Sequence, residues 1–390
     1  MISWRSYKLK ELCSDIIDCV NKTAPLSPIP TPYKMLRTSD IRNGKINLEN
    51  LNCVSEQTYL LWTRRGKLQK GDVILTREAP LGEVGLVKKP NNYFLGQRLV
   101  LLRADPKKAD NRFLLYALQF HDNKQAIISK GVGSTVLHLR VPECEKIEIY
   151  APELPQQKKI ADILSAYDDL IENNQKQIKL LEEAAQRLYK EWFVDLRFPG
   201  WENTKIVDGV PEGWERLPLP QIADIQYGFA FDGSLFNSSG YGTPIVRIRN
   251  IPDAETSDFT SEEASSEYLI NNGDIIVGMD GEFHINSWAG GQAYLVQRTC
   301  CIRPKIEKMR GWLLYSIHEP IKYFEKTIVG ATVAHLGKKH LDSITLLVPT
   351  EELYAPFISI FNKRQILMEE NIKLREARDK LIYILMDKRV

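Results

Sequence analysis

The sequence contains the same pattern twice, once in residues 1–194 and again in residues 214–390. Each copy begins near a tryptophan and ends in a long stretch with helical periodicity. The spacing between matched motifs changes slightly along the chain, as expected of a duplication with altered loops. Such a chain should build two similar domains that contact two similar targets. The matched motifs are Trp4 and Trp214, 35–41 and 245–251, 70–74 and 272–276, 97–98 and 297–298, 114–116 and 313–315, and 133–139 and 330–336.

The composition is that of a globular protein with more than one domain. With 390 residues, 43% of them hydrophobic and 26% charged, the chain is too long for one ordinary core and is not of the disordered class. A formal net charge of +2 neither requires nor excludes a nucleic-acid partner.

The lack of a targeting signal and the pattern of cysteines both favour a cytoplasmic location. No apolar run approaches the roughly 18 residues of a membrane span, and the N-terminus lacks the apolar core of a signal peptide. The six cysteines form no CxxC pair, so we interpret them as reduced thiols and expect a cytoplasmic protein.

The first part of each copy is predicted to be α+β. Short apolar segments at 72–75, 99–102 and 147–150 are bounded by Gly, Pro or charged residues, which is typical of strands. A short helix is expected over 112–120 and again over 311–318. This order does not alternate strand and helix, as a parallel α/β sheet would require.

The last part of each copy is predicted to be a helix of about 35 residues, roughly 50 Å long. One such helix would most simply be an amphipathic core helix, but two are better accommodated by packing against each other. If the copies are related by a two-fold axis, the helices run antiparallel and form a coiled coil, in which the polar Asn174 fixes the register. The expected seam residues are Ile171, Asn174, Ile178, Leu181, Leu188, Leu367, Leu374 and Leu381.

The ends of these helices carry further expectations. Thr350 precedes Glu351 and Glu352, which predicts a threonine N-cap with acidic residues in the first turn. The paired carboxylates at 168–169 and 182–183 are most simply the solvated face of the first helix. The turn-rich segment from 197 to 214 should return the chain to the start of the second copy.

The common catalytic and nucleotide-binding signatures are absent from the sequence. It has no HExxH, GxSxG or EF-hand pattern. The segment 330–339 has six residues between its glycines and lacks the Ser or Thr of a phosphate-binding loop. His335 and His340 are not on one helical face, and no third ligand completes a metal site. We therefore expect a non-catalytic chain without a metal.

Two motifs resemble a known family. The run from 154 to 174, beginning Leu-Pro-Gln-Gln-Lys-Lys-Ile-Ala-Asp-Ile-Leu, and its continuation at 188–200 resemble the central region of the specificity subunits of type I restriction–modification systems. The segment 211–215 looks like the opening of a second target-recognition domain, and 68–77 looks like a Gly-Asp strand within such a domain. The C-terminal helix lacks the Gln-Gln-Lys-Lys entry of the central one.

The resemblance implies two pseudo-two-fold-related α/β target-recognition domains separated by two long antiparallel helices that form a coiled coil. The expected division is recognition domain 1 at 1–152, a central spacer helix at 153–196, a linker and recognition domain 2 at 197–349, and a C-terminal spacer helix at 350–390. The two domains would recognise an asymmetric bipartite site in double-stranded DNA.

The resemblance also implies partners. Two methyltransferase subunits would dock on the chain, and motor–nuclease subunits would add cleavage. No cofactor is expected in this chain, because S-adenosylmethionine, ATP and Mg²⁺ would be bound by those partners.

Candidate DNA-binding residues are chosen because Arg and Lys suit guanine and phosphate, Asn suits adenine, and carboxylates suit cytosine. Each could instead be a surface charge or a structural ion pair. Arg98 and Arg298 recur in both copies and favour structural pairs, while His138 and His335 suit either a turn or a phosphate contact. The candidates are Arg37, Thr38, Ser39, Arg42, Arg64, Arg65, Arg77, Glu78, Lys130, Ser134, His138, Arg247, Arg249, Asn250, Asp280, His284, Lys338 and Lys339.

The difference between 76–78 (Thr-Arg-Glu) and 278–280 (Gly-Met-Asp) is where we expect the two half-sites to be distinguished. Two alternatives remain open from the sequence. The chain could be the recognition subunit of a type IIB-like enzyme, which a neighbouring gene would decide. It could also be a coiled-coil protein adaptor without a DNA role, which leaves the family motifs unexplained.

Overall fold

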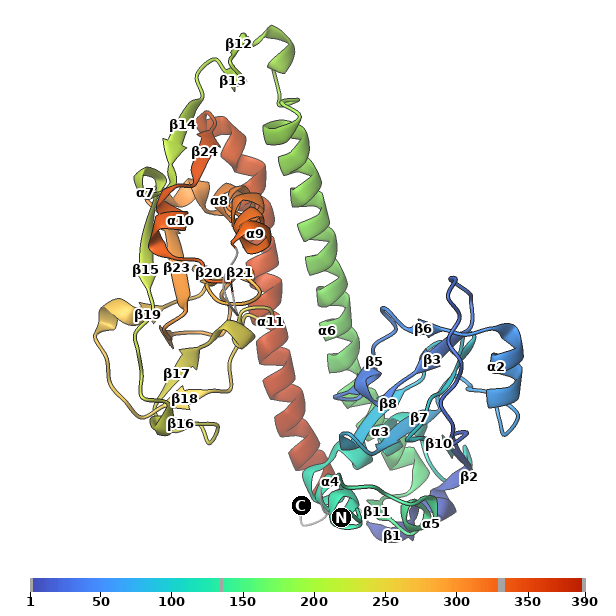
Figure 1. Ribbon diagram of the computed structural model, residues 1–390. Helices are drawn as coiled ribbons and strands as arrows, with labels where there is room; N and C mark the ends of the chain where they lie inside the picture. Colours follow the sequence, from blue (N-terminus) through green and yellow to red (C-terminus); the bar gives the residue numbers. More distant parts are fainter. Residues whose placement is uncertain (1–2, 134–135, 329–333, 388–390) are drawn as a thin grey trace. The chain divides into compact units, whose positions relative to one another are not determined.

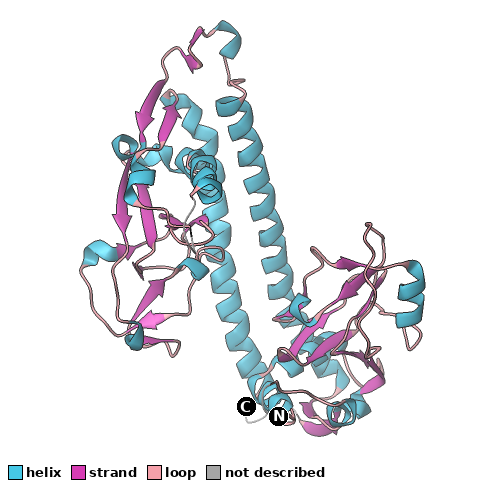
Figure 2. Ribbon diagram, in the orientation of Figure 1, coloured by secondary structure: helices cyan, strands magenta, loops and turns pink. Residues whose placement is uncertain are grey.

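The computed structural model describes residues 3–133, 136–328 and 334–387, and it divides into two compact units. Unit 1 comprises Met1–Asp169 and Ala377–Val390, and unit 2 comprises Leu170–Glu376. Figure 2 shows that each unit combines strands with helices, as the α+β expectation requires. No helix among the described residues is long and apolar enough to cross a membrane.

Unit 1 is built on a four-stranded antiparallel sheet (Figure 1). Its order is β2 (Cys13–Asp18), β10 (Leu99–Ala104), β7 (Val73–Arg77) and β8 (Leu81–Leu86). The predicted strands at 72–75 and 99–102 are therefore confirmed as adjacent strands, with Leu101 paired to Ile74 on one side and Ile17 on the other.

A smaller three-stranded sheet adjoins it in the order β6 (Asn52–Cys53), β3 (Lys34–Leu36) and β9 (Tyr93–Leu95). Strands β3 and β9 are parallel, with Met35 opposite Phe94. The helix α2 (Glu56–Trp62) follows β6.

Helices and a strand pair complete unit 1. The predicted helix at 112–120 is α3 (Asn111–Gln119), whose N-cap Asp110 accepts hydrogen bonds from the backbone N–H groups of Arg112 and Phe113. The strand predicted at 147–150 is confirmed as β11. The remaining elements are β1 (Arg5–Lys8) paired with β11 (Glu148–Ala151), β4 (Ile41–Arg42) paired with β5 (Lys45–Ile46), α1 (Leu9–Leu12), α4 (His121–Ser129) and α5 (Val141–Glu145).

Unit 2 repeats the four-stranded sheet and the parallel strand pair of unit 1. The sheet β15 (Ala223–Tyr227), β23 (Thr299–Pro304), β20 (Ile275–Gly278) and β21 (Ile285–Ser287) has the same antiparallel order. The parallel pair recurs as β17 (Thr243–Val246) and β22 (Ala293–Leu295). The duplication in the sequence is thus a duplication of fold.

The second copy differs mainly in its smaller sheet, which has five strands in the order β16, β18, β17, β22 and β19. The predicted helix at 311–318 corresponds to α8. The remaining elements are β16 (Phe236–Asn237), β18 (Phe259–Thr260), β19 (Leu269–Ile270), β12 (Ile206–Val207) paired with β13 (Val210–Pro211), β14 (Glu215–Pro218) paired with β24 (Thr345–Val348), α7 (Leu219–Ile222), α8 (Arg310–Ser316), α9 (His318–Thr327) and α10 (Lys338–Asp342).

Two long helices, α6 (Leu154–Tyr189) and α11 (Ala355–Met386), each contribute to both units. Within unit 2 they run antiparallel, because Asn174 contacts Glu370 whereas Glu182, further along α6, contacts the earlier Arg364. Within unit 1, Asp168 contacts Arg378. Two antiparallel helices were expected, and the contacts inside each unit confirm them.

The seam residues differ in burial. Ile171, Asn174 and Leu367 are buried, because each faces the opposite helix or its own unit. Leu188 packs against the main core of unit 2, and Leu381 packs against the main core of unit 1. The other expected seam residues, Ile178, Leu181 and Leu374, are partly buried.

The structure differs from the sequence-based expectations for these helices in two respects. Asp168 and Glu182 are not simply solvated, since each accepts from an Arg of α11, at 2.6 Å from Arg378 and at 2.7 Å from Arg364. Thr350 does occupy an N-cap position, but its side chain makes no capping hydrogen bond.

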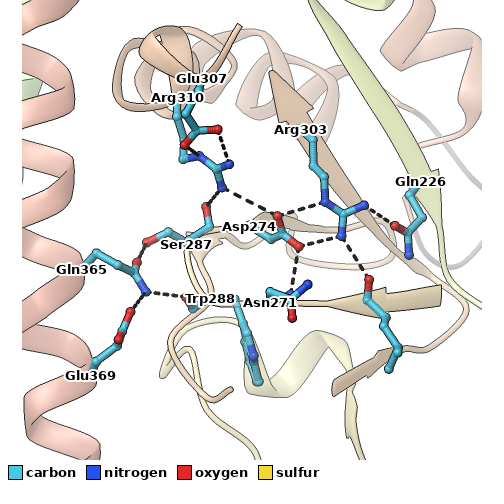
Figure 3. A network of polar contacts seen from close by, with 12 residues as sticks. Gln226, Asn271, Asp274, Ser287, Trp288, Arg303, Glu307, Arg310, Gln365 and Glu369 are labelled. Carbon is cyan, nitrogen blue, oxygen red and sulfur yellow. Dashed lines mark hydrogen bonds and ion pairs between the residues drawn. The ribbon is translucent and has the colours of Figure 1, made fainter. Parts of the chain in front are cut away.

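In each copy, the buried aspartate of the Gly-Asp motif forms an ion pair with a partly exposed Arg of the large sheet. In unit 1, Arg103 pairs with Asp72 through Nε at 2.9 Å. In unit 2, Arg303 pairs with Asp274 through Nη2 at 2.6 Å, and Arg310 lies 3.7 Å from the same carboxylate (Figure 3).

Figure 3 also shows how α11 is joined to the sheet region of unit 2. Gln365 accepts from Ser287 Oγ at 2.9 Å and donates to the Trp288 carbonyl at 2.7 Å. Helix α11 and the sheet region of unit 2 are therefore held together by buried polar contacts, and not by apolar packing alone.

Candidate nucleic-acid interface

The candidate residues near the start of each copy form the same tight turn. In unit 1 the backbone N–H of Arg37 donates to Asp40 at 2.8 Å, and a side-chain hydrogen bond to that carboxylate raises the pKa of Arg37. In unit 2 the backbone N–H of Arg247 donates to Asn250 Oδ1 at 2.9 Å, and its guanidinium lies over Phe236. Each turn holds an Arg directly after the parallel strand β3 or β17.

Other members of these turns are more exposed. Ser39 and Arg42 are exposed, and Arg42 Nη1 donates to the Thr38 carbonyl at 2.9 Å. Arg249 pairs with Asp258 at 2.5 Å on an exposed surface. These side chains have protein partners, yet remain accessible to a ligand.

A second cluster lies at the end of β7 in unit 1. Glu78 binds the Nε of Arg98 with Oε1 at 3.2 Å and the Nδ1 of His138 with Oε2 at 3.1 Å. The carboxylate is largely buried, whereas half of the Arg98 side chain is exposed. The cluster therefore presents the Arg98 guanidinium outward and keeps the Glu78 carboxylate behind it.

The corresponding cluster in unit 2 lies at the end of β20. Asp280 contacts the Nε of Arg298 at 3.4 Å and the Nδ1 of His335 at 2.6 Å. Arg298 Nη1 is also 3.4 Å from His335 Nδ1. The shorter distance to Asp280 indicates that Nδ1 carries the proton and donates it to the carboxylate.

Arg77 is not at the surface, in contrast to our expectation of a DNA reader. Its side chain is 6% exposed, pairs with Asp18 at 2.8 Å and donates to the Leu139 carbonyl at 3.3 Å. An Arg at the end of a central strand must point either out of or into the fold, and here Asp18 stabilises the inward orientation. Arg77 is therefore a structural residue.

The neighbouring differences between the copies are also internal. Thr76 is buried and donates to the Pro80 carbonyl at 2.6 Å, while Gly278 and Met279 are buried in unit 2. Of the segments 76–78 and 278–280, only the carboxylates reach the surface. The first two positions of each tripeptide are buried, and the expectation that the two tripeptides distinguish the half-sites stays a prediction.

The remaining candidates are scattered over both units. Arg64 and Arg65 are exposed after α2, and Arg65 donates to the Cys19 carbonyl at 2.8 Å. Lys130 is the half-buried residue that ends α4. Ser134 lies outside the described residues.

In unit 2, Lys338 and Lys339 are exposed at the start of α10. His284 is partly buried, with Glu282 at 3.7 Å. No cluster of His, Cys, Asp or Glu suited to a metal is found in the part of the chain that the structure describes.

The candidate list omitted three residues that the clusters bring to the surface, namely Arg98, Arg298 and His335. The available signal was their repetition in both copies. Repetition alone suited a structural pair equally well, because it does not reveal which side of the pair faces solvent.

Comparison with known proteins identifies the family. The model of the type I restriction modification DNA specificity domain matches residues 1–183 and 211–375, one match for each copy. The chain belongs to this family. The two matches follow the boundaries of the duplicated fold, including most of both long helices.

Relatives within the type I specificity family span most of the chain. The MjaIX specificity subunit of Methanocaldococcus jannaschii is 26% identical over 340 residues, covering 80% of this chain and 76% of the relative. The MjaVIII specificity subunit of the same organism is 27% identical and covers 91% and 85%. The EcoBI specificity subunit of Escherichia coli is 34% identical over only 37% of this chain and 30% of its own length.

A solved structure of a type I specificity subunit has the same fold. The crystal structure of the S subunit of a type I restriction–modification system from M. genitalium covers 99% of this chain and 97% of its own, with a TM-score of 0.61 at 17% identity. The α+β units and long helices found here are therefore the fold of this type I family.

Proposed function

We propose that this chain is the DNA sequence-specificity subunit of a type I restriction–modification complex and recognises an asymmetric, bipartite site in double-stranded DNA. The observation that carries the proposal is the separate match of each fold copy to the DNA specificity domain. Two similar but non-identical readers in one chain suit two different half-sites, whereas a homodimer would suit a palindrome.

Each unit would read one half-site. The copies differ in their smaller sheets, which have three strands in unit 1 and five in unit 2. These regions carry the turns of Arg37 and Arg247, so we assign the distinguishing base contacts to them and not to the buried residues at the ends of β7 and β20. Base-specific contacts from loops on a rigid sheet are a common solution in DNA recognition.

The long helices would set the number of base pairs between the half-sites. Helix α6 alone has 36 residues, which corresponds to about 54 Å. Recognition surfaces on one face of DNA recur about every 34–36 Å, so a helical spacer is suited to that scale. Methyltransferase and motor–nuclease subunits would dock on this chain and supply the chemistry, and the chain itself would bind no cofactor and catalyse no step.

The test is methylation mapping. The chain is co-expressed with a methyltransferase subunit of a type I system in a host lacking other methylation, and modified positions are sequenced. We expect a single bipartite motif. Replacing residues 1–152 with the corresponding segment of a relative should change one half-site only. A change in both half-sites, or methylation without sequence preference, would contradict the proposal.

A recognition subunit of a type IIB-like enzyme remains the second candidate. It predicts the same mapped motif, but cleavage of DNA on both sides of the site by the complex without a motor subunit. A protein adaptor predicts no salt-dependent binding of duplex DNA by the complex.

A further inference from the structure

The clusters of Arg98 and Arg298 are held by one backbone arrangement. In unit 1 the N–H of Arg77 donates to the Arg98 carbonyl at 2.8 Å, and the Arg77 carbonyl accepts from Leu139 at 2.9 Å. In unit 2, Met279 makes the corresponding bonds, to the Arg298 carbonyl at 2.9 Å and from Leu336 at 2.8 Å. The two clusters are copies of one site. The residue that makes both backbone hydrogen bonds is Arg77 in unit 1 and Met279 in unit 2.

Both arginines adopt a backbone conformation that disfavours a side chain. Arg98 has φ of 69° and Arg298 has φ of 70°, in the left-handed region where a Cβ meets steric conflict. Glycine or asparagine would adopt this conformation more easily. Because both copies keep Arg there, we infer that its side chain has a use beyond completing the turn.

The side chains leave donors directed to solvent. Glu78 engages Nε of Arg98 and Nδ1 of His138, and no described residue accepts a hydrogen bond from the two Nη groups of Arg98, which remain as donors. In unit 2, Asp280 engages Nε of Arg298, and Arg298 Nη1 lies 3.4 Å from His335 Nδ1. The Arg98 and Arg298 side chains are 50% and 56% exposed. Each carboxylate thus positions an Arg and a His beside each other at the surface.

We propose that each cluster binds a phosphate of the DNA backbone. This rests on the proposed function, and adds that Arg98 with His138, and Arg298 with His335, make a contact that is the same in both half-sites. Different half-sites share their backbone but not their bases, so a site retained in both readers fits the shared part.

The experiment measures DNA binding by the chain in complex with its methyltransferase partner. The probes are a duplex of about 40 base pairs carrying the mapped site and a duplex of scrambled sequence, titrated from low to high salt. The variants are Arg98→Asn, Arg298→Asn and the double variant, because asparagine tolerates the left-handed backbone. Arg187→Gln is the matched control, since Arg187 is an exposed, carboxylate-paired Arg on α6.

We expect each single variant to weaken binding of both duplexes by about tenfold, leaving their ratio unchanged. The slope of log K against log salt should become shallower by about 1 in each single variant and by about 2 in the double variant. Arg98→Lys should keep the wild-type slope, because Lys also binds phosphate as a point charge. The Arg187→Gln control should keep both affinity and slope.

Three results would overturn the inference. If the Arg98 and Arg298 variants keep the wild-type salt slope but unfold at a lower temperature, the clusters have a structural role only. Relaxed preference at a single base position, not rescued by Arg98→Lys, would make Arg98 a base reader. An equal loss of DNA affinity in Arg187→Gln would show that the effect comes from the overall positive charge of the chain and not from these clusters. Failure of the proposed function is a different result. It would appear as a wild-type complex that binds the mapped and scrambled duplexes equally.

Discussion

Asn174 Nδ2 on α6 donates a hydrogen bond to Glu370 Oε2 on α11 at 2.8 Å. Asn174 is buried, whereas Glu370 is exposed. A buried amide in a helix seam specifies register at a cost in stability. Asn174→Leu should therefore raise the free energy of unfolding by about 1 kcal/mol, measured by denaturant titration. A decrease would mean that the amide contributes net stability.

The buried carboxylate of Asp274 should be far more important than an exposed one. Asp274→Asn leaves Arg303 without its counter-charge, while Arg310 keeps its pair with Glu307, and should destabilise unit 2 by about 2–3 kcal/mol, less than a fully buried pair because Arg303 is one third exposed. Glu183→Gln is the control, since its pair with Arg187 is exposed, and should cost under about 0.5 kcal/mol. Equal thermal shifts in the two variants would refute this difference.

Glu83 should contribute to acid sensitivity. Burial raises the pKa of Glu83, but hydrogen bonds from Lys124 Nζ at 2.6 Å and from the Asn43 N–H at 3.0 Å outweigh it, so the net pKa is below its usual value. A lowered pKa gives stability that is complete above the unfolded-state value and is lost as the pH falls through the folded-state value.

The free energy of unfolding of the wild type should therefore fall more steeply than that of Glu83→Gln as the pH decreases below about 4.5. Denaturation curves at several pH values measure this. Parallel profiles for the two proteins would show that Glu83 is not linked to folding.

Cys53 should be the most reactive thiol. Lys34 Nζ donates to its sulfur at 2.9 Å and lowers the pKa of Cys53. Burial raises the pKa of Cys13, Cys144 and Cys300, each to about 12. Because the thiolate is the nucleophile, iodoacetamide at neutral pH should modify Cys53 first.

Peptide mass spectrometry of the alkylated protein identifies the modified residue. Lys34→Met should slow the reaction of Cys53 severalfold and leave the buried thiols unreactive. Prior modification of Cys13 or Cys300 in the native protein would contradict the burial described here.

Local patterns in the sequence predicted the regular elements well. The seven-residue spacing around Ile171 gave a helix because its apolar positions face one side, and the apolar run at 99–102 gave a central strand because it is buried on both faces. Such signals depend on neighbours in the chain. The parallel pairing of β3 with β9 does not, because it joins segments that residues 37–92 separate in the chain.

At the candidate site, the direction of the side chains was the main feature that the sequence did not predict. Arg77 and Arg98 are both arginines near strand ends, yet one is drawn inward by Asp18 and the other is held half-exposed by Glu78. The partner carboxylates come from other elements, so composition and spacing could not separate the two arginines. The sequence did indicate that Arg98 and Arg298 are equivalent, because they recur in both copies. Only the fold shows that their side chains reach the surface.

Unit 1 is made from two distant parts of the chain, and this has a consequence for the order of assembly during translation. Leu381 and Met386 at the end of α11 belong to the same apolar cluster as Leu9 and Leu12. The ribosome therefore releases nearly all of unit 2 before the segment that finishes the first core. The first domain to emerge is the last to be completed, and it must persist with an open apolar face until the final turns of α11 arrive.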